Sequence, residues 1–332
     1  MVNNHRNILI NKIFNLSSEI DFEKIALELF AYQAQNNSVY GKYLKLLGIS
    51  YAEISKITDI PFLPVSLFKT QMIITGNTDR NVVFRSSGTG DGTPSCHYIA
   101  DPGLYESCFM RTFKKFYGEP SGYTILALLP SYLEREDSSL VYMVSRLIEK
   151  SAGAESGFYL SDIDSLAEVL MQLEAESRKT MLIGVSFALL DLIEKHRFSL
   201  KNTILMETGG MKGRRKELTR EELHSVLKEG TGLNRIHSEY GMTELMSQAY
   251  SMADGIFKTP PWMRILIRDA YNPFSYLSPG RSGGINIIDL ANIDSCAFIE
   301  SADLGRSMQG GEFEVLGRFD NSDVRGCNLL AG

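Results

Sequence analysis

The segment VVFRSSGTGDGTPSCHYI, residues 82–99, places a run of glycine, serine and threonine between two apolar stretches. The apolar stretches predict two strands, and the small residues predict a loop between them. Glycine lets the backbone approach a ligand closely and adopt positive φ, so amides and hydroxyls of such a loop can point toward a polyanion. Phosphate is therefore the ligand that this loop favours, although a plain flexible turn can have the same composition.

Two common phosphate-binding motifs do not describe this loop. The Walker A pattern GxxxxGK[ST] fails because Thr93 and Pro94 follow the first glycine where the pattern needs glycine and lysine. The dinucleotide pattern GxGxxG fails because Thr93 stands where the third glycine would follow Gly88 and Gly90. The sequence therefore supports neither a P-loop NTPase nor a Rossmann-type dehydrogenase.

Composition and charge exclude further classes of function. The chain has 332 residues, of which 44% are hydrophobic, and 34 basic against 40 acidic side chains give a net charge of −6. No basic stripe indicates nucleic-acid binding, and no apolar stretch has the length of a membrane span. The N-terminus lacks the continuous apolar region of a signal peptide. Cysteine spacing favours a reduced cytoplasmic setting without a zinc site, and we expect Cys96, Cys108 and Cys296 to be buried.

The order of apolar patterns along the chain predicts an α/β domain followed by a β-rich part. Residues 22–35 have the spacing of an amphipathic helix, whereas the prolines at 61 and 64 predict an extended segment. Strands are then predicted at 123–129, 180–185 and 203–208, and helices at 139–150 and 187–195. Another helix is predicted to begin at Ser161, with Asp164 completing a capping box. The last helix is predicted to begin at Thr219, with Glu222 three residues on, and to end at Gly230. Alternation of this kind is typical of parallel sheets. Several short strands are predicted after Pro260.

Four segments, in this order, resemble motifs of the adenylate-forming superfamily, which contains acyl-CoA synthetases and luciferases. The loop SSGTGDGTPS resembles the phosphate loop [ST]SGTTGxPK, and SEYGMTEL (238–245) resembles YGxTE. The segment ESADLGR (300–306) resembles TGDLG, and VLGRFDNSD (315–323) resembles the GRxDD hinge. A closer resemblance, to the acyl-protein synthetases of the bacterial fatty-acid reductase complex, rests on IPFLPVSLFK (60–69), ETGGMKGR (207–214) and VRGCNLL (324–330). The chain also resembles the phenylacetate-CoA ligases.

The resemblance implies an α/β fold that consists of the large N-terminal domain of an adenylate-forming enzyme with a β-rich C-terminal subdomain. Residues 1–312 would form this AMP-binding domain, and residues 313–332 a short hinge-like tail that carries Cys327. Only 12 residues follow Asp320, so the usual C-terminal lid domain and its lysine are not expected. Ser95 also replaces the usual lysine of the phosphate loop.

The resemblance also implies activation of a carboxylic acid, with a fatty acid as the expected substrate and ATP and Mg²⁺ as cofactors. Tyr240 and Gly241 would lie at the adenine, Thr243 would bind the α-phosphate, and Glu244 would bind Mg²⁺. Asp303 would accept hydrogen bonds from the ribose hydroxyls, and Arg318 would donate one near the ribose or phosphate. The β- and γ-phosphates would be held by Ser86, Ser87, Gly88, Thr89, Gly90 and Thr93, and the adenine pocket lined by Gly209 and Gly210. His237 is either a substrate contact or a structural hydrogen bonder.

In the acyl-protein synthetases the acyl group passes to a C-terminal cysteine, which by resemblance is Cys327, with Arg325 favouring its thiolate. A reductase or a carrier protein would then accept the acyl group. Two alternatives remain open at this point: an acyl- or aryl-CoA ligase or stand-alone acyl-adenylate former, and a nucleotide-binding subunit without activity.

Overall fold

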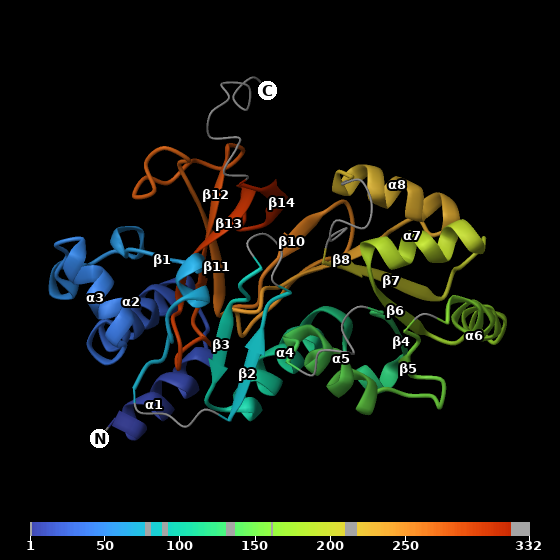
Figure 1. The fold of residues 1–332 in the computed structure, drawn as a ribbon, viewed down its shortest axis with the longest axis horizontal. Coiled ribbons are helices and arrows are strands. Elements are labelled where there is room, and N and C mark those ends of the chain that lie inside the picture. Colours follow the sequence, from blue (N-terminus) through green and yellow to red (C-terminus); the bar gives the residue numbers. More distant parts are fainter. Residues whose placement is uncertain are drawn as a thin grey trace. The chain divides into compact units, whose positions relative to one another are not determined.

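The computed structural model describes residues 2–76, 81–87, 92–130, 137–160, 162–209 and 218–319. The chain divides into two compact units. The described residues of unit 1 lie within Met1–Leu67, Ile73–Gly76 and Pro261–Gly332, and those of unit 2 within Phe68–Met72 and Asn77–Pro260. Figure 1 labels the helices and strands of both units.

Unit 2 contains the predicted parallel sheet. Its strand order is β10-β9-β8-β7-β6-β4-β5, in which the five strands from β8 to β5 are parallel and β9 and β10 are antiparallel. The strands are β4 (Thr124–Leu128), β5 (Gly157–Phe158), β6 (Thr180–Val185), β7 (Thr203–Thr208), β8 (His237–Tyr240), β9 (Ala249–Ser251) and β10 (Ile256–Lys258). β4 and β6 are buried throughout, as expected for parallel strands covered on both faces.

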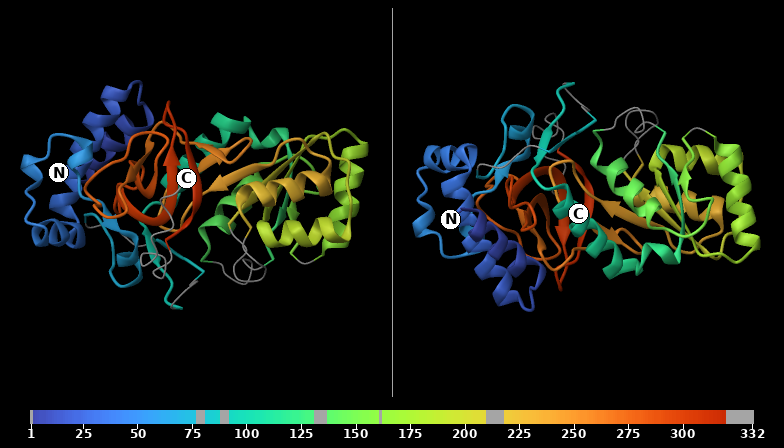
Figure 2. Two further views of the ribbon diagram at one scale, coloured as in Figure 1. Left: turned by 90° about the horizontal axis from the view of Figure 1, so that it is seen from above. Right: turned by 90° about the horizontal axis from the view of Figure 1, so that it is seen from below.

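Helices connect the parallel strands and cover the sheet. They are α4 (Pro102–Tyr117), α5 (Ser139–Glu149), α6 (Ile163–Ala175), α7 (Ser186–Lys195) and α8 (Arg220–Thr231). In Figure 1, α7 and α8 lie side by side above the strands of unit 2 and α5 lies below them, and Figure 2 views the sheet from these two sides. The predicted strands at 123–129, 180–185 and 203–208 and the helices between them are confirmed.

Two predicted helix ends are wrong. α6 has Asp162 as its N-cap, whose side chain accepts a hydrogen bond from the amide of Ser165, so Asp164 belongs to the first turn rather than to a capping box; Ser161 lies outside the described residues. The capping box of Thr219 and Glu222 on α8 is confirmed.

The helix α8 does not end at Gly230 but continues to Thr231, where Gly232 caps it at φ 76°. Gly230 lies inside the helix because α7 packs closely there: a Cβ on Gly230 would lie 2.6 Å from Cβ of Ile193. Close helix packing, rather than helix termination, is therefore the reason for this glycine.

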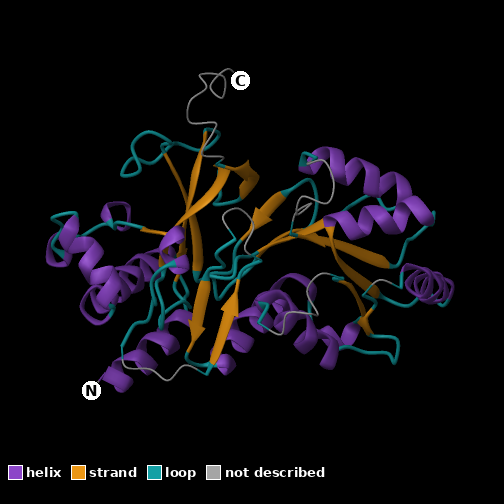
Figure 3. Cartoon of the chain, viewed as in Figure 1, coloured by secondary structure: helices purple, strands orange, loops and turns teal. Residues whose placement is uncertain are grey.

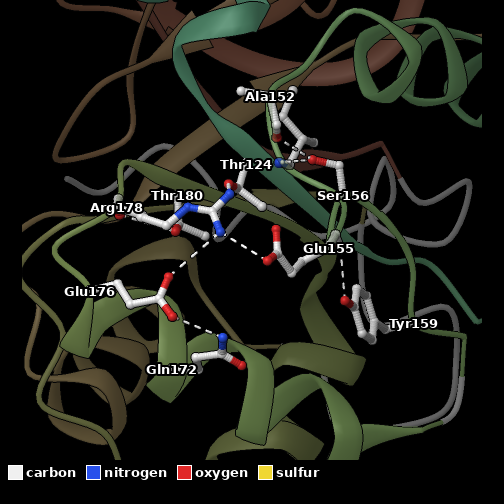
Figure 4. A network of polar contacts seen from close by, with 10 residues as sticks. Thr124, Ala152, Glu155, Ser156, Tyr159, Gln172, Glu176, Arg178 and Thr180 are labelled. Atoms are coloured by element: carbon white, nitrogen blue, oxygen red, sulfur yellow. Dashed lines mark hydrogen bonds and ion pairs between the residues drawn. The ribbon is translucent and has the colours of Figure 1, made fainter.

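An ionic network fixes the short edge strand β5 in unit 2 (Figure 4). Arg178 donates from Nη1 to Oε1 of Glu155 at 2.9 Å and from Nη2 to the hydroxyl of Thr124 at 2.9 Å. The hydroxyl of Tyr159 donates to the carbonyl of Glu155 at 2.8 Å. Since β5 has only two residues, these side chains hold the segment around it against the start of β4.

Unit 1 combines N-terminal helices with an antiparallel sheet, shown by secondary structure in Figure 3. The sheet consists of β11 (Met263–Arg268), β12 (Ser282–Asp289), β13 (Phe298–Ser307) and β14 (Phe313–Arg318), and β1 (Leu63–Pro64) pairs parallel with β13. The helices are α1 (Val2–Phe14), α2 (Glu19–Asn36) and α3 (Ser38–Leu46), with 3₁₀ turns at Tyr51–Glu53 and Ile57–Asp59. A further 3₁₀ turn, Val65–Lys69, begins in unit 1 and ends in unit 2. The predicted helix at 22–35 and the strands after Pro260 are confirmed.

Buried side chains join the helices of unit 1 to its sheet. Phe30, Tyr40 and Phe62 all contact the ring of Phe298 at centroid distances of 5.9–6.3 Å. Gln33 on α2 donates to three carbonyls between residues 292 and 295 and accepts from the amide of Ala297. These contacts fix the start of β13 against α2.

The cysteines differ from expectation at one position. Cys108 and Cys296 are fully buried as predicted, and burial raises the pKa of the Cys296 thiol to about 12. Cys96 on β3 (Cys96–Ile99) is only half-buried, because it lies at the end of a two-stranded hairpin with β2 (Val82–Arg85) rather than inside a large sheet. None of the helices in the described ranges is both long and apolar enough to cross a membrane.

Candidate nucleotide-binding site

The glycine-rich loop is the connection of the β2–β3 hairpin. The amide of Ser86 donates to the carbonyl of Ser95 at 3.0 Å, and the amide of Ser95 donates to the hydroxyl oxygen of Ser86 at 2.9 Å. Ser87 and Thr93 are exposed at the two ends of the loop. Ser86 therefore closes the base of the loop, a role that the sequence did not predict; Gly88, Thr89 and Gly90 lie outside the described residues.

Gly209 and Tyr240 lie at the same edge of the parallel sheet in unit 2. Thr208 at the end of β7 is in register with Val185 on β6 and with Glu239 on β8. The residues that follow these strands therefore meet at their carboxyl ends, where open α/β sheets bind ligands. Gly209 is exposed, has φ 68°, and accepts a hydrogen bond on its carbonyl from the hydroxyl of Ser186 at 3.1 Å. Gly210 lies outside the described residues.

The YGMTE segment forms a turn directly after β8. The amide of Leu245 donates to the carbonyl of Met242 at 3.1 Å, Thr243 is half-buried and Glu244 is buried. Gly241 is exposed, and a Cβ at this position would lie 2.4 Å from Oε1 of Glu239. The carboxylate of Glu239 therefore lies directly against the backbone of Gly241.

A buried histidine joins the hairpin to this turn. Nδ1 of His97 on β3 lies 2.8 Å from the carbonyl oxygen of Thr243. A carbonyl can only accept, so Nδ1 carries the proton and donates it. His97 is 1% exposed and contacts the ring of Phe68. His97 and Thr243 are 146 residues apart in the sequence, and their bond connects the two motif segments. Sequence reasoning missed this histidine.

Two buried glutamates, Glu207 on β7 and Glu239 on β8, lie near the carboxyl ends of these strands. Glu207 accepts from Nε of Arg220 at 3.1 Å and lies 3.6 Å from Nε2 of His224. Burial alone would raise the pKa of Glu207, but hydrogen bonding with His224 and the charge of Arg220 outweigh it and lower the pKa. Glu207 therefore anchors the end of β7 as a carboxylate.

The surroundings of Glu239 shift its pKa in the opposite direction from that of Glu207. Its Oε2 accepts from the hydroxyl of Thr208 at 2.5 Å, and no ion pair to another described residue offsets its burial. Burial, with a contribution from the nearby charge of Glu207, raises the pKa of Glu239 to about 7. Sequence reasoning missed the buried carboxyl group of Glu239, because an acidic residue on a short strand is usually exposed.

His237 is held inside unit 2. Its Nδ1 lies 3.2 Å from the hydroxyl of Tyr117 on α4, and their rings are 5.7 Å apart. Burial and the positive charge of Arg235 lower the pKa of His237 to about 4, so the imidazole is neutral at pH 7. This contact favours the structural hydrogen bonder of the two roles that the sequence left open.

Asp303 and Arg318 form a pair in unit 1. They lie opposite each other on β13 and β14, and Nε of Arg318 donates to Oδ1 of Asp303 at 3.2 Å. The Asp303 side chain is 9% exposed and that of Arg318 is 65% exposed. Two residues predicted from separate motifs are therefore brought together. Asp320 and Cys327 lie outside the described residues.

No protein-family model and no curated protein matches the sequence. Solved structures do match it. ATP-bound MatB from Rhodopseudomonas palustris is 18% identical, with 73% of this chain and 49% of that chain covered and a TM-score of 0.54. 2-Hydroxyisobutyryl-CoA ligase in complex with 2-HIB-AMP and CoA is 12% identical, with 91% and 71% covered and a TM-score of 0.64. o-Succinylbenzoate CoA synthetase (MenE) from Bacillus subtilis is 18% identical, with 73% and 50% covered and a TM-score of 0.51.

The chain spans 48–51% of the MatB and MatB-chimera chains that it matches. At these identities the likeness concerns the fold. The chain has the mixed α/β fold of the adenylate-forming enzymes, with the large sheet and β-rich part that the sequence predicted.

Proposed function

We propose that the protein activates a carboxylic acid with ATP. A carboxylate oxygen attacks the α-phosphorus of ATP, the bond to the β-phosphate oxygen breaks, and pyrophosphate leaves an acyl-AMP. The bond from His97 to Thr243 carries this proposal, because it joins the hairpin that bears the glycine-rich loop to the turn that contains Thr243 and Glu244. Phosphoryl transfer needs mainly positioning and charge stabilisation, which amide and hydroxyl donors held at one place supply.

Each nucleotide group has candidate ligands among these residues. Ser86, Ser87 and Thr93, with Gly88, Thr89 and Gly90, would bind the β- and γ-phosphates, and Thr243 the α-phosphate. The backbone at Gly209 and Gly210 and the segment Tyr240–Gly241 would contact the adenine. The Asp303 carboxylate has lone pairs for both ribose hydroxyls in addition to its bond with Arg318.

Glu244 suits Mg²⁺, since it is a buried carboxylate next to the Thr243 turn and hard oxygen ligands are those that Mg²⁺ prefers. When bound, the ion would neutralise phosphate charge. Glu244 would hold it, and Thr243 would orient the α-phosphate toward the incoming carboxylate.

The second half-reaction that we propose is acyl transfer to the thiolate of Cys327. The sulfur attacks the acyl carbon, the acyl–oxygen bond of acyl-AMP breaks, and AMP leaves with the electron pair. A reductase or carrier protein would then take the acyl group, and a fatty acid would be the substrate. This step is supported by the resemblance of VRGCNLL to the acyl-protein synthetases.

A CoA thiol is the second candidate acceptor. It is favoured by the matched structure of 2-hydroxyisobutyryl-CoA ligase, whose title describes a complex with 2-HIB-AMP and CoA. In that case AMP release would depend on CoA rather than on Cys327.

One experiment separates the acceptors. The full chain is incubated with Mg·ATP and radiolabelled tetradecanoic acid, and label on the protein is measured on denaturing gels with and without neutral hydroxylamine. Label on the wild type and on Cys108→Ala, but not on Cys327→Ser, is expected. Equal label on Cys327→Ser, or AMP release that requires CoA, would contradict transfer to Cys327.

A further inference from the structure

Arg268, the last residue of β11, has its side chain buried against β12. Its direct cross-strand partner is Gly284, and a Cβ there would lie 2.3 Å from the guanidinium carbon. A Cβ at Gly283 would lie 2.2 Å from the carbonyl oxygen of Arg268. The two consecutive glycines therefore leave the space that this arginine occupies, and the residue is 6% exposed.

The guanidinium contacts three segments of unit 1. Nη1 donates to the carbonyl of Ile285 at 2.9 Å, and Nη2 donates to the carbonyl of Ser301 at 2.8 Å. The guanidinium carbon also lies 5.4 Å from the ring centroid of Phe319, the residue after Arg318. One planar side chain thus joins β12, β13 and the end of β14.

These contacts occur where strand pairing is irregular. Gly284 pairs with Leu304 and Asn286 pairs with Glu300, so residues 301–303 of β13 stand opposite Ile285 alone. Regular ladder bonds do not fix a bulged segment of this kind. Asp303 lies within it. Its backbone is paired with Arg318 of β14 on one side, whereas on the β12 side its position depends on side-chain contacts.

Arg268 supplies those contacts together with Ser301. The hydroxyl of Ser301 donates to the carbonyl of Ile285 at 2.9 Å and accepts from the amide of Asp303 at 3.1 Å. On the other side of the segment, the amide of Phe319 donates to the carbonyl of Ala302 at 2.8 Å. The guanidinium holds the carbonyls of Ile285 and Ser301 and the ring of Phe319, so it sets the position of the backbone that carries Asp303.

We infer that Arg268 is a positioning residue for the carboxylate of Asp303 and thereby for recognition of the ATP ribose. The inference rests on the proposed function, in which Asp303 accepts hydrogen bonds from both ribose hydroxyls. Recognition of two hydroxyls by one carboxylate requires a fixed orientation, whereas general attraction of Mg·ATP does not. Loss of Arg268 should therefore weaken discrimination between ATP and 2′-deoxy-ATP.

The test measures binding of Mg·ATP and Mg·2′-deoxy-ATP to the full chain by titration calorimetry. The ratio of the two dissociation constants is compared because misfolded protein lowers the number of sites and leaves this ratio unchanged. A hydrogen bond to a charged group implies a wild-type preference for ATP of about tenfold or more. In Arg268→Lys the ratio should fall to about threefold or less, because an ammonium cannot reproduce the planar fork.

Two further variants sharpen the test. Gly284→Ala keeps the arginine but places a methyl group on the guanidinium, so it should lower the ratio as Arg268→Lys does. Arg264→Lys is the matched control: Arg264 lies on the same strand, with its guanidinium 3.9 Å from the ring of Phe22 and 2.5 Å from Glu19, away from Asp303. It should keep the wild-type ratio.

Loss of discrimination in Arg268→Lys and Gly284→Ala, but not in Arg264→Lys, would support the inference. A wild-type ratio in Arg268→Lys would overturn it. ATP binding by the wild type without any preference over 2′-deoxy-ATP would also overturn it while leaving adenylation intact. Absence of ATP binding to the wild type would overturn the proposed function itself.

Discussion

Arg318 lies opposite Asp303 on the neighbouring strand and donates a hydrogen bond from Nε to its Oδ1 at 3.2 Å. The aspartate is buried and the arginine largely exposed, so the pair presents a buried carboxylate beside an exposed cation. Under the proposed function, this carboxylate would accept hydrogen bonds from the ribose of ATP.

Replacing Asp303 by alanine should weaken Mg·ATP binding by about 10- to 100-fold, because hydrogen bonds to a charged acceptor would be lost. Calorimetric titration measures the effect. Asp59→Asn, an exposed aspartate of unit 1, is the control and should bind ATP as the wild type does. Unchanged affinity in Asp303→Ala would contradict the assignment of the ribose site.

Replacing His97 by alanine should lower kcat/KM for acid-dependent AMP formation by about tenfold, the effect of losing roughly one buried hydrogen bond in the transition state. The Thr243 carbonyl would lose its donor, and the turn that presents Thr243 and Glu244 would be less well held. His196→Gln, at the end of α7 in a partly exposed pair with Asp164, should retain activity. Equal rates in both variants would argue against a role for the His97 bond.

Glu239 should make the protein less stable as pH rises. Its pKa is about 7 when folded against a usual value of 4.5, so the folded state binds more protons between these values, and the free energy of unfolding falls as pH increases from about 4.5 through 7. The full effect is roughly 3 kcal/mol.

Urea unfolding at pH 5 and pH 8 tests this, with Glu239→Gln as the comparison. The glutamine variant cannot titrate, so the wild type should lose stability relative to it on going from pH 5 to pH 8. Parallel pH dependences of the two proteins would show that Glu239 is not a buried acid with a raised pKa.

Gly230→Ala should destabilise the protein by about 1–3 kcal/mol, although alanine is the better helix former, because the new methyl group would overlap Ile193 on α7. Gly122→Ala introduces a methyl group that meets nothing within 4 Å and serves as the control. Urea unfolding of both variants gives the difference, and a stabilised Gly230→Ala would show that α7 and α8 do not pack as closely as described.

The sequence predicted the parallel part of the fold well, because β4, β6 and β7 are short apolar runs buried on both faces and separated by amphipathic helices. It placed the end of α8 incorrectly because Gly230 resembles a helix terminator, whereas the packing of Ile193 against it depends on tertiary structure. The strand β13 extends further than its apolar part, to Ser307, because it pairs along its length with β12 and then β14.

Candidate residues could be named from the sequence where they belong to a local motif, as for Tyr240 and Asp303, and their roles stay predictions. His97 and Arg268 could not, because each acts through a carbonyl far along the chain and a carbonyl has no sequence signature. The titration of Glu239 was equally hidden, since it follows from burial and from the neighbouring Glu207 on another strand.

Exchange of radiolabelled pyrophosphate into ATP tests the central claim most directly. The full chain with Mg·ATP should catalyse exchange only when a carboxylic acid is added, with tetradecanoic acid tested beside shorter aliphatic and aryl acids. The account predicts acid-dependent exchange that persists in Cys327→Ser, since adenylation precedes acyl transfer. Binding of ATP without exchange for any of these acids would contradict it and would indicate a nucleotide-binding subunit.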